Sequence, residues 1–253
     1  MDRNPIKILE SLGQSIWLDY IRRDLMVSGE LRRLIEVDGL RGMTSNPSIF
    51  EKAIVEGHDY DADIRAMALA GKDQKAIYEA LTRRDVQMAA DEFRPLYNKL
   101  DAQDGYVSLE VDPHLAHDTD GTIEEAIRLW KEADRPNVFI KVPSTVEGLP
   151  AIKRLVGEGI NINITLLFGL PRYRQVAEAY IDGIETRLAQ GRDVTHVASV
   201  ASFFLSRIDT LVDPLLEQII ANGGDKAARC VPAAVESVAV DDCARRWSHH
   251  SLD

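Results

Sequence analysis

Short apolar runs alternate with longer stretches of helical periodicity along this chain. Six runs rich in β-branched and aromatic residues predict strands, at 15–21, 39–45, 106–111, 137–142, 159–165 and 195–204. Helical patterns lie at 73–100, 122–133, 171–191 and 211–224, and the crossover from 46 to 105 is long enough for three helices. This alternation is typical of a parallel sheet built from βα units.

The polar residues within the predicted strands distinguish between two parallel-sheet folds. Each of the six strands carries one polar residue in it or at its end: Asp19, Asn46, Glu110, Lys141, Asn163 and Ser202. A barrel collects its active site from the ends of several strands, whereas a dinucleotide-binding fold has a glycine-rich turn after its first strand. The segment "LDYIRRDL" has no glycine. The pattern therefore predicts an α/β fold of the TIM (β/α)8 barrel type with about six recognisable strands.

The C-terminal part of the sequence does not continue this pattern. After 225 it offers at most one weak strand, "ESVAV", so two strands of a closed barrel are missing from the count. An unclosed barrel leaves sheet edges exposed. We therefore expect a barrel domain over 1–225 and an atypical tail over 226–253.

Composition and charge argue against two classes of binding partner, nucleic acids and membrane surfaces. The 253 residues are 45% hydrophobic and carry a formal net charge of −11, with a pI near 5.1. A nucleic-acid or membrane-surface protein would show a basic footprint, so neither partner is expected. The first residues are too polar for a secretory signal, and no apolar run approaches the ~18 residues of a spanning helix. Two cysteines, Cys230 and Cys243, fit a cytoplasmic protein.

Lys141 interrupts the apolar run "NVFIKV" and is the most informative single residue. Lysine is rarely buried, and burial favours its neutral form, which is a nucleophile able to form a Schiff base with a carbonyl. Alternatively, Lys141 reaches out between helices or pairs with a carboxylate. Glu110 and Asp19 fit either interpretation, because both could move protons for imine chemistry or simply pair with the lysine.

Metal and cofactor signals are weak. The segment "DTDG" at 118–121 lacks the later glutamate of a calcium loop and is better interpreted as the lead into the next helix. His114 and His117 have no ligand-type pattern and should be surface residues. We expect no metal and no organic cofactor, because the lysine supplies the electrophile.

Five blocks of sequence, in order, resemble the transaldolase family. They are "DGLRGMTSNPSIF", "VSLEVDP", "VFIKVPSTVEG", "NINITLLF" and "SVASFFLSRID", within a match from about residue 5 to about residue 220. The long insertions resemble the bacterial branch that also occurs fused to glucose-6-phosphate isomerase. Nothing after about residue 225 resembles the family pattern.

The resemblance implies catalytic roles for four residues. Lys141 is similar to the family's Schiff-base lysine, and Asp19 to the acid/base that takes the proton from the substrate C4 hydroxyl. Glu110 is similar to the carboxylate that acts through a water and the hydroxyl of Thr165 on the carbinolamine. Without the family, Asp19 is an exposed strand-end aspartate and Thr165 an ordinary strand threonine.

The resemblance also implies substrate-binding residues. Asn46, Asn163 and Ser202 match positions that bind the dihydroxyacetone hydroxyls and the C4 side of the intermediate, and Arg207 matches a phosphate-binding arginine. Thr44 and Phe204 match residues packed around the site. From the residues alone, Asn46 is a helix N-cap before Pro47, and Arg207 is a helix-surface arginine.

The implied activity is transfer of a dihydroxyacetone unit from sedoheptulose 7-phosphate to glyceraldehyde 3-phosphate, in the pentose phosphate pathway. Fructose-6-phosphate aldolases resemble this pattern with glutamine at the Glu110 position and tyrosine at the Phe204 position, so Glu110 and Phe204 favour transfer. Because Phe203 lies beside Phe204, either phenylalanine could align with this tyrosine position. A further alternative is a truncated or frame-shifted product that is inactive or needs a partner at its open edge. The sequence does not decide the oligomeric state, and a homo-oligomer is one alternative.

Overall fold

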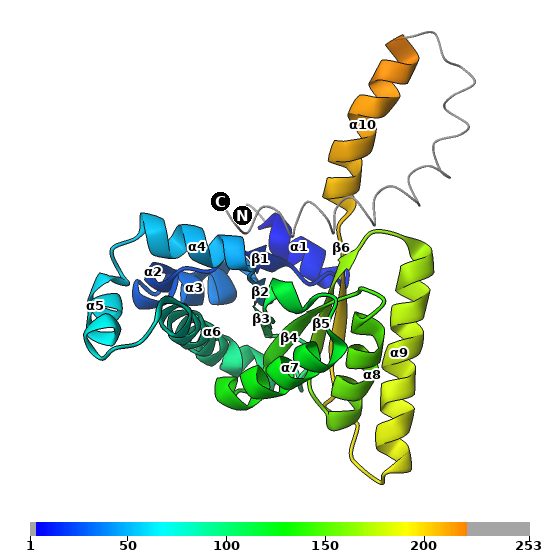
Figure 1. Cartoon of the computed structure of the whole chain (residues 1–253). Helices are drawn as coiled ribbons and strands as arrows, with labels where there is room; N and C mark the ends of the chain where they lie inside the picture. Colours follow the sequence, from blue (N-terminus) through cyan, green and yellow to red (C-terminus); the bar gives the residue numbers. More distant parts are fainter. Residues whose placement is uncertain (1–3, 222–253) are drawn as a thin grey trace. The chain divides into compact units, whose positions relative to one another are not determined.

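A computed structural model describes residues 4–221 of the chain (Figure 1). The expected atypical tail over 226–253 lies outside the described residues. The described residues divide into two compact units, one containing 4–111 and 125–141 and the other containing 112–124 and 142–221. The division falls within the fourth strand, directly after Lys141.

All six predicted strands are present, each shorter than or shifted slightly from its predicted range. They are β1 (Trp17–Asp19), β2 (Gly42–Thr44), β3 (Val107–Glu110), β4 (Val138–Pro143), β5 (Ile162–Leu167) and β6 (Ser199–Phe203). The sheet has the order β1-β2-β3-β4-β5-β6, and its recorded strand pairs are parallel. Six parallel strands alternating with helices form an α/β fold of the TIM type with an incomplete barrel among the described residues, as predicted.

The helices occupy the segments between the strands. In the first unit they are α1 (Pro5–Ser11), α2 (Arg23–Val27), α3 (Glu30–Arg33), the π-helix η1 (Leu34–Asp38), α4 (Pro47–Glu56), α5 (Asp61–Leu69) and α6 (Gln74–Lys99). The 3₁₀ helix η2 (Pro113–Leu115) and α7 (Thr119–Ala133) follow β3, and α8 (Gly148–Glu158), α9 (Leu170–Ala189) and α10 (Leu205–Ala221) belong to the second unit. The crossover from 46 to 105 holds the three helices α4, α5 and α6, as expected.

Stacked aromatic rings fill the first unit near the start of its strands. The Phe139 ring stacks on Tyr106 with centroids 4.2 Å apart and on Trp17 with centroids 6.0 Å apart. Gly42 lies opposite Trp17 in the β1–β2 register, and a Cβ there would come within 2.3 Å of the indole. Only glycine leaves room for this ring, so the aromatic stack depends on residue 42.

A buried ionic cluster fixes the long crossover. Arg23 of α2 donates to Asp85 of α6 over 2.8 Å and to Asp63 of α5 over 2.6 Å. The Tyr60 hydroxyl donates to the other Asp85 oxygen over 2.7 Å. Because Asp85 and Tyr60 are fully buried, these bonds satisfy polar groups that would otherwise be costly to bury.

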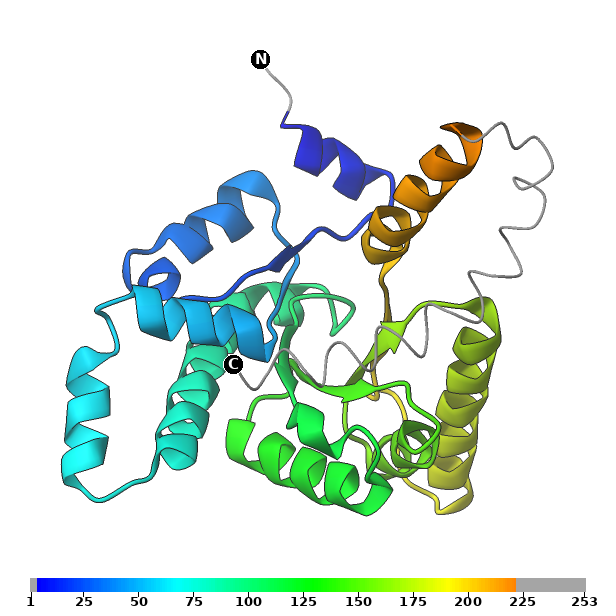
Figure 2. The ribbon, with the colours of Figure 1, turned by 45° about the horizontal axis from the view of Figure 1, so that its top comes forward.

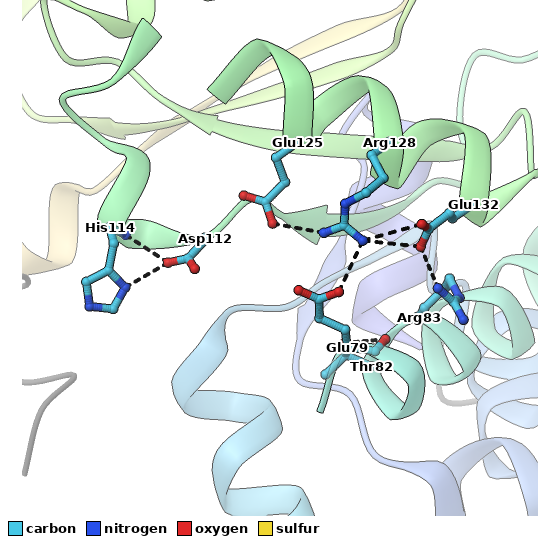
Figure 3. A network of polar contacts seen from close by, with 8 residues as sticks. All are labelled: Glu79, Thr82, Arg83, Asp112, His114, Glu125, Arg128 and Glu132. Atoms are coloured by element: carbon cyan, nitrogen blue, oxygen red, sulfur yellow. Dashed lines mark hydrogen bonds and ion pairs between the residues drawn. The ribbon is translucent and has the colours of Figure 1, made fainter. Parts of the chain in front are cut away.

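A second ionic network joins α6 to the part of α7 in the same unit (Figure 3). Arg128 of α7 contacts Glu79 of α6 over 3.1 Å, and Arg83 of α6 contacts Glu132 of α7. Glu125 and Glu132 flank Arg128 on its own helix at i−3 and i+4. Since these side chains are partly exposed, the network contributes little to the free energy of folding. Its main effect is to orient α6 and this part of α7 relative to one another.

Close packing of α8 against α9 organises the second unit, where both views show the two helices side by side (Figure 1, Figure 2). Gly183 of α9 makes this possible, because a Cβ there would meet Val156 at 2.7 Å and the Lys153 carbonyl at 2.8 Å. In contrast, α10 has no buried residue, and Leu205, Leu215 and Ile220 are more than half exposed. No helix within 4–221 is long and apolar enough to cross a membrane.

Candidate active site

Lys141 lies in β4, the one strand within residues 4–221 in which every residue is buried. Lys141 itself is 5% exposed. The sequence prediction of a buried lysine in an apolar strand is therefore confirmed.

The lysine amine has two partners in the first unit, from β3 and from the end of β2. Lys141 Nζ lies 3.2 Å from Glu110 Oε2, and both side chains are almost fully buried. Nζ also donates a hydrogen bond to the backbone carbonyl of Ser45 over 3.2 Å. Glu110 is opposite Lys141 in the parallel register, which places the two side chains together. Of the two carboxylates left open by the sequence, Glu110 is the one in contact with the lysine.

Asp19 and Thr44 end the two neighbouring strands. Asp19 is the exposed last residue of β1 and is opposite Thr44, the last residue of β2. The Thr44 Oγ1 atom is buried and has no hydrogen-bond partner among the described residues. Polar groups therefore stand at the carboxyl ends of successive strands, where active sites of this fold type form.

Asn46 acts as a helix cap, as the sequence predicted. Its side-chain oxygen accepts from the Ile49 N–H over 3.0 Å, and Pro47 occupies the first helical position of α4. The cap bond uses one lone pair of Oδ1, so the second lone pair and the Nδ2 donor are the groups of this amide that could contact a ligand.

In the second unit, two of the predicted substrate-binding residues are in direct contact. The Ser202 hydroxyl of β6 donates to Asn163 Oδ1 of β5 over 2.7 Å. Asn163 is 1% exposed, so this bond fixes the orientation of a buried amide.

Thr165, also of the second unit, precedes a β-bulge. The β5–β6 register shifts between Ile164 and Leu167, and Leu166 has φ +62°, a conformation that is strained for a leucine. Ser144 holds this distorted segment with two bonds, because its N–H donates to the Thr165 carbonyl and its Oγ donates to the Leu166 carbonyl, each over 2.9 Å. The bulge changes the direction of the chain directly after Thr165.

Phe204 and Arg207 form a stacked pair after β6. The Arg207 guanidinium carbon lies 4.6 Å from the Phe204 ring centroid, and Phe168 stacks on the same ring at 5.6 Å. Arg207 is exposed. The Phe204 ring therefore holds the Arg207 guanidinium near the end of β6 through a cation–π contact.

Comparisons with known proteins give the family of the chain. The model of the family described as Transaldolase/Fructose-6-phosphate aldolase matches residues 16–241. The chain belongs to the transaldolase/fructose-6-phosphate aldolase family. A transaldolase of Trichodesmium erythraeum is 48% identical over 236 residues, which are 93% of this chain and 62% of that protein. Transaldolase 2 of a Nostoc species is 50% identical over 222 residues, 88% of this chain and 58% of that protein. A transaldolase of Mycobacterium tuberculosis is 48% identical over 218 residues, 86% and 58% of the two chains.

This chain spans about 60% of the length of these transaldolase relatives. The family assignment covers the predicted site blocks, since all five lie within the matched residues. It does not by itself assign roles to individual residues, which stay predictions.

Two residues that contact predicted site residues or their neighbours were missed by sequence reasoning: Ser45, which contacts the lysine in the first unit, and Ser144, which holds the bulge in the second. Both follow strands, in "MTSN" and "KVPST", but a serine at a strand end is too common to single out. His114 and His117 are exposed, as predicted; His114 contacts Asp112 over 2.7 Å (Figure 3), and His117 contacts Glu147 over 3.2 Å.

Proposed function

We propose that this chain is a Schiff-base transaldolase that transfers a dihydroxyacetone unit between sugar phosphates in the pentose phosphate pathway. The observation that carries the proposal is the buried Lys141 Nζ, 3.2 Å from the Glu110 carboxylate. A lysine needs a neutral amine to attack a carbonyl, and a neighbouring carboxylate can accept the proton that the ammonium must lose. Family membership supports the same chemistry.

The first stage is formation of the imine. The Lys141 amine attacks the C2 carbonyl of sedoheptulose 7-phosphate to give a carbinolamine. We assign to Glu110, acting through a water and the Thr165 hydroxyl, the proton transfers that release water and leave a protonated imine. Thr165 is buried, and its backbone carbonyl accepts a hydrogen bond from the Ser144 N–H. This bond fixes the backbone at Thr165, which supports the role.

The second stage breaks and remakes a carbon–carbon bond. We assign to Asp19 the removal of the C4 hydroxyl proton, so that the C3–C4 bond breaks and its electrons pass into the protonated imine. Erythrose 4-phosphate leaves, and the lysine-bound three-carbon unit adds to the aldehyde of glyceraldehyde 3-phosphate. Asp19 then returns the proton, and hydrolysis of the imine releases fructose 6-phosphate.

The remaining polar groups are proposed to bind the substrate. Neutral donors and acceptors suit sugar hydroxyls, which fits Asn46, Asn163, Ser202 and the Thr44 hydroxyl, for which residues 4–221 offer no hydrogen-bond partner. Arg207 is the proposed phosphate ligand, since its exposed guanidinium is held against Phe204.

A transfer assay tests the proposal. Fructose 6-phosphate and erythrose 4-phosphate are mixed with the chain, and formation of sedoheptulose 7-phosphate and glyceraldehyde 3-phosphate is measured. We expect turnover that requires both sugars and is abolished by Lys141→Met. Release of free dihydroxyacetone without an acceptor would favour the fructose-6-phosphate aldolase alternative. No turnover in either assay would favour an inactive or partner-dependent chain.

Location and assembly are proposed with the activity. A cytoplasmic enzyme fits the substrates and the two cysteines. The exposed apolar residues of α10 make self-association of the chain a reasonable expectation. Sedimentation velocity over a concentration series tests this, and a constant monomer mass would contradict it.

A further inference from the structure

The geometry points to Ser45 as a positioning residue for the Lys141 amine, an inference that rests on the proposed Schiff-base function. Ser45 directly follows β2, is fully buried, and touches the lysine through its backbone carbonyl. Its role is to hold the amine so that the lone pair has one fixed direction.

The contacts of Nζ limit the direction of its lone pair. In the reactive neutral form the amine has two N–H groups and one lone pair. One N–H is donated to the Ser45 carbonyl over 3.2 Å, and the Glu110 carboxylate lies 3.2 Å from Nζ as its ion-pair partner. The carbonyl bond and the neighbouring carboxylate together restrict the direction that the lone pair can take. A buried amine can react only from an open side, so this direction decides whether it meets a carbonyl carbon.

The Ser45 carbonyl can serve in this way because the backbone on both sides of it is fixed. The Ser45 hydroxyl donates to the Ser108 carbonyl of β3 over 2.8 Å, and both serines are fully buried. On the other side, Asn46 caps α4 with extended dihedrals, φ −150° and ψ 167°, which is the region that the following Pro47 favours. The carbonyl is therefore held between a strand-to-strand bond and a helix cap.

The hydrogen bond from the Ser45 hydroxyl also connects the two groups that contact Nζ, the Ser45 carbonyl and the Glu110 carboxylate. Ser108 lies two residues before Glu110 on β3, so the same bond joins the strand that carries Glu110 to the residue that offers the carbonyl. Removing the hydroxyl should let the two oxygens move independently. The lysine would remain present and buried but would present its lone pair in more than one direction.

The test compares Ser45→Ala with Ser45→Thr, which keeps the hydroxyl. Ser11→Ala is the matched control, because its exposed hydroxyl also donates to a backbone carbonyl but lies in α1. Each variant receives formaldehyde and cyanoborohydride, and methylation of Lys141 is measured by mass spectrometry relative to half-exposed Lys153 in the same sample. This reaction needs no sugar, so it gives an answer whether or not the chain is a transaldolase.

We expect Ser45→Ala to slow Lys141 methylation about tenfold, the effect of one lost hydrogen bond, while Ser45→Thr and Ser11→Ala stay within about twofold of the parent chain. A wild-type rate in Ser45→Ala, or an equal loss in Ser45→Thr, would overturn the inference. In the sugar-transfer assay the Ser45→Ala change should lower kcat and leave KM unchanged. Because a loss of folded protein would also lower the apparent kcat, the rate is expressed per folded molecule, with the folded fraction measured by circular dichroism. Absence of any sugar imine in the parent chain would contradict the proposed function, with the methylation result standing separately.

Discussion

Lys141 Nζ and Glu110 Oε2 lie 3.2 Å apart in the interior of the first unit. Their strands are adjacent and in register, so the contact follows directly from the pairing of β3 with β4. A charged pair in such a place is expensive to desolvate. It is compatible with both interpretations of the buried lysine: the amine does pair with a carboxylate, and the proposed chemistry uses that same carboxylate.

The pair predicts an asymmetric stability effect. Glu110→Gln leaves the lysine charge buried without its counter-charge and should lower the free energy of unfolding by about 3 kcal/mol. Adding Lys141→Met removes that charge, so the double variant should be more stable than Glu110→Gln alone. Urea unfolding of the three proteins measures this. A double variant that is no more stable than Glu110→Gln would show that the two groups do not form a charge pair.

Asp19 should affect cleavage without affecting imine formation. Asp19→Ala removes the group assigned to take the C4 hydroxyl proton, and the transfer rate should fall about 10²- to 10⁴-fold. Borohydride trapping of the ketose on the variant should proceed as in the parent chain. Asp61→Ala, at an exposed position in α5, is the control. Equal losses of trapping and transfer in Asp19→Ala would argue against the assignment.

Ser144 should stabilise the bulge that follows Thr165. Ser144→Ala removes the 2.9 Å bond from Oγ to the Leu166 carbonyl and should cost about 1 kcal/mol of stability. It should also reduce the transfer rate, because the strained segment then relaxes. The control is Thr210→Ala, whose hydroxyl bonds a carbonyl within exposed α10. Thermal unfolding and the transfer assay together test the prediction, and unchanged activity would remove Ser144 from the site.

A salt link at the end of α8 predicts a pH dependence. A hydrogen bond from Arg192, with the nearby charge of Arg154, holds the pKa of the Glu158 carboxyl below its usual range. A lowered folded-state pKa gives stability that is present above the unfolded value of about 4.3 and is lost as pH falls through the folded value. Since Glu158 is one-third exposed, the contribution is at most about 1 kcal/mol.

Arg192→Gln tests this salt link. At pH 7 the variant should be less stable than the parent chain, and the difference should shrink as pH falls below about 4. It should not vanish, because Arg192 also donates to the carbonyls of Gly157 and Glu158, which do not titrate. Urea unfolding across the pH range measures the difference. A pH-independent gap would mean that only the carbonyl bonds matter.

Much of the fold could be predicted because its pattern is local. The apolar strand runs, the three-helix crossover and the Asn46 cap before Pro47 all depend on short segments, and each was predicted correctly. Helix ends were predicted less well: α7 begins at Thr119 rather than near Thr122, and α10 begins at Leu205, six residues before its predicted start. Both are the polar or mixed first turns of helices, where the apolar period is weakest.

At the candidate site, the burial of Lys141 could be predicted from the sequence, and its supporting contacts could not. The burial of Lys141 followed from its apolar neighbours, but its contact with the Ser45 carbonyl depends on tertiary structure that joins residues 96 apart in the chain. The bulge was hidden because its strained residue is a leucine in an apolar run, with no glycine to mark a positive φ. The roles assigned to Asp19, Thr165 and Arg207 come from the family resemblance and stay predictions.

The most direct measurement for the central claim is the site of sugar attachment. The chain is incubated with fructose 6-phosphate, reduced with borohydride and mapped by mass spectrometry, with Lys141→Met as the control. The account predicts one sugar-derived adduct, on Lys141, absent from the control. No adduct on Lys141, or one on another lysine, would contradict a Schiff-base enzyme.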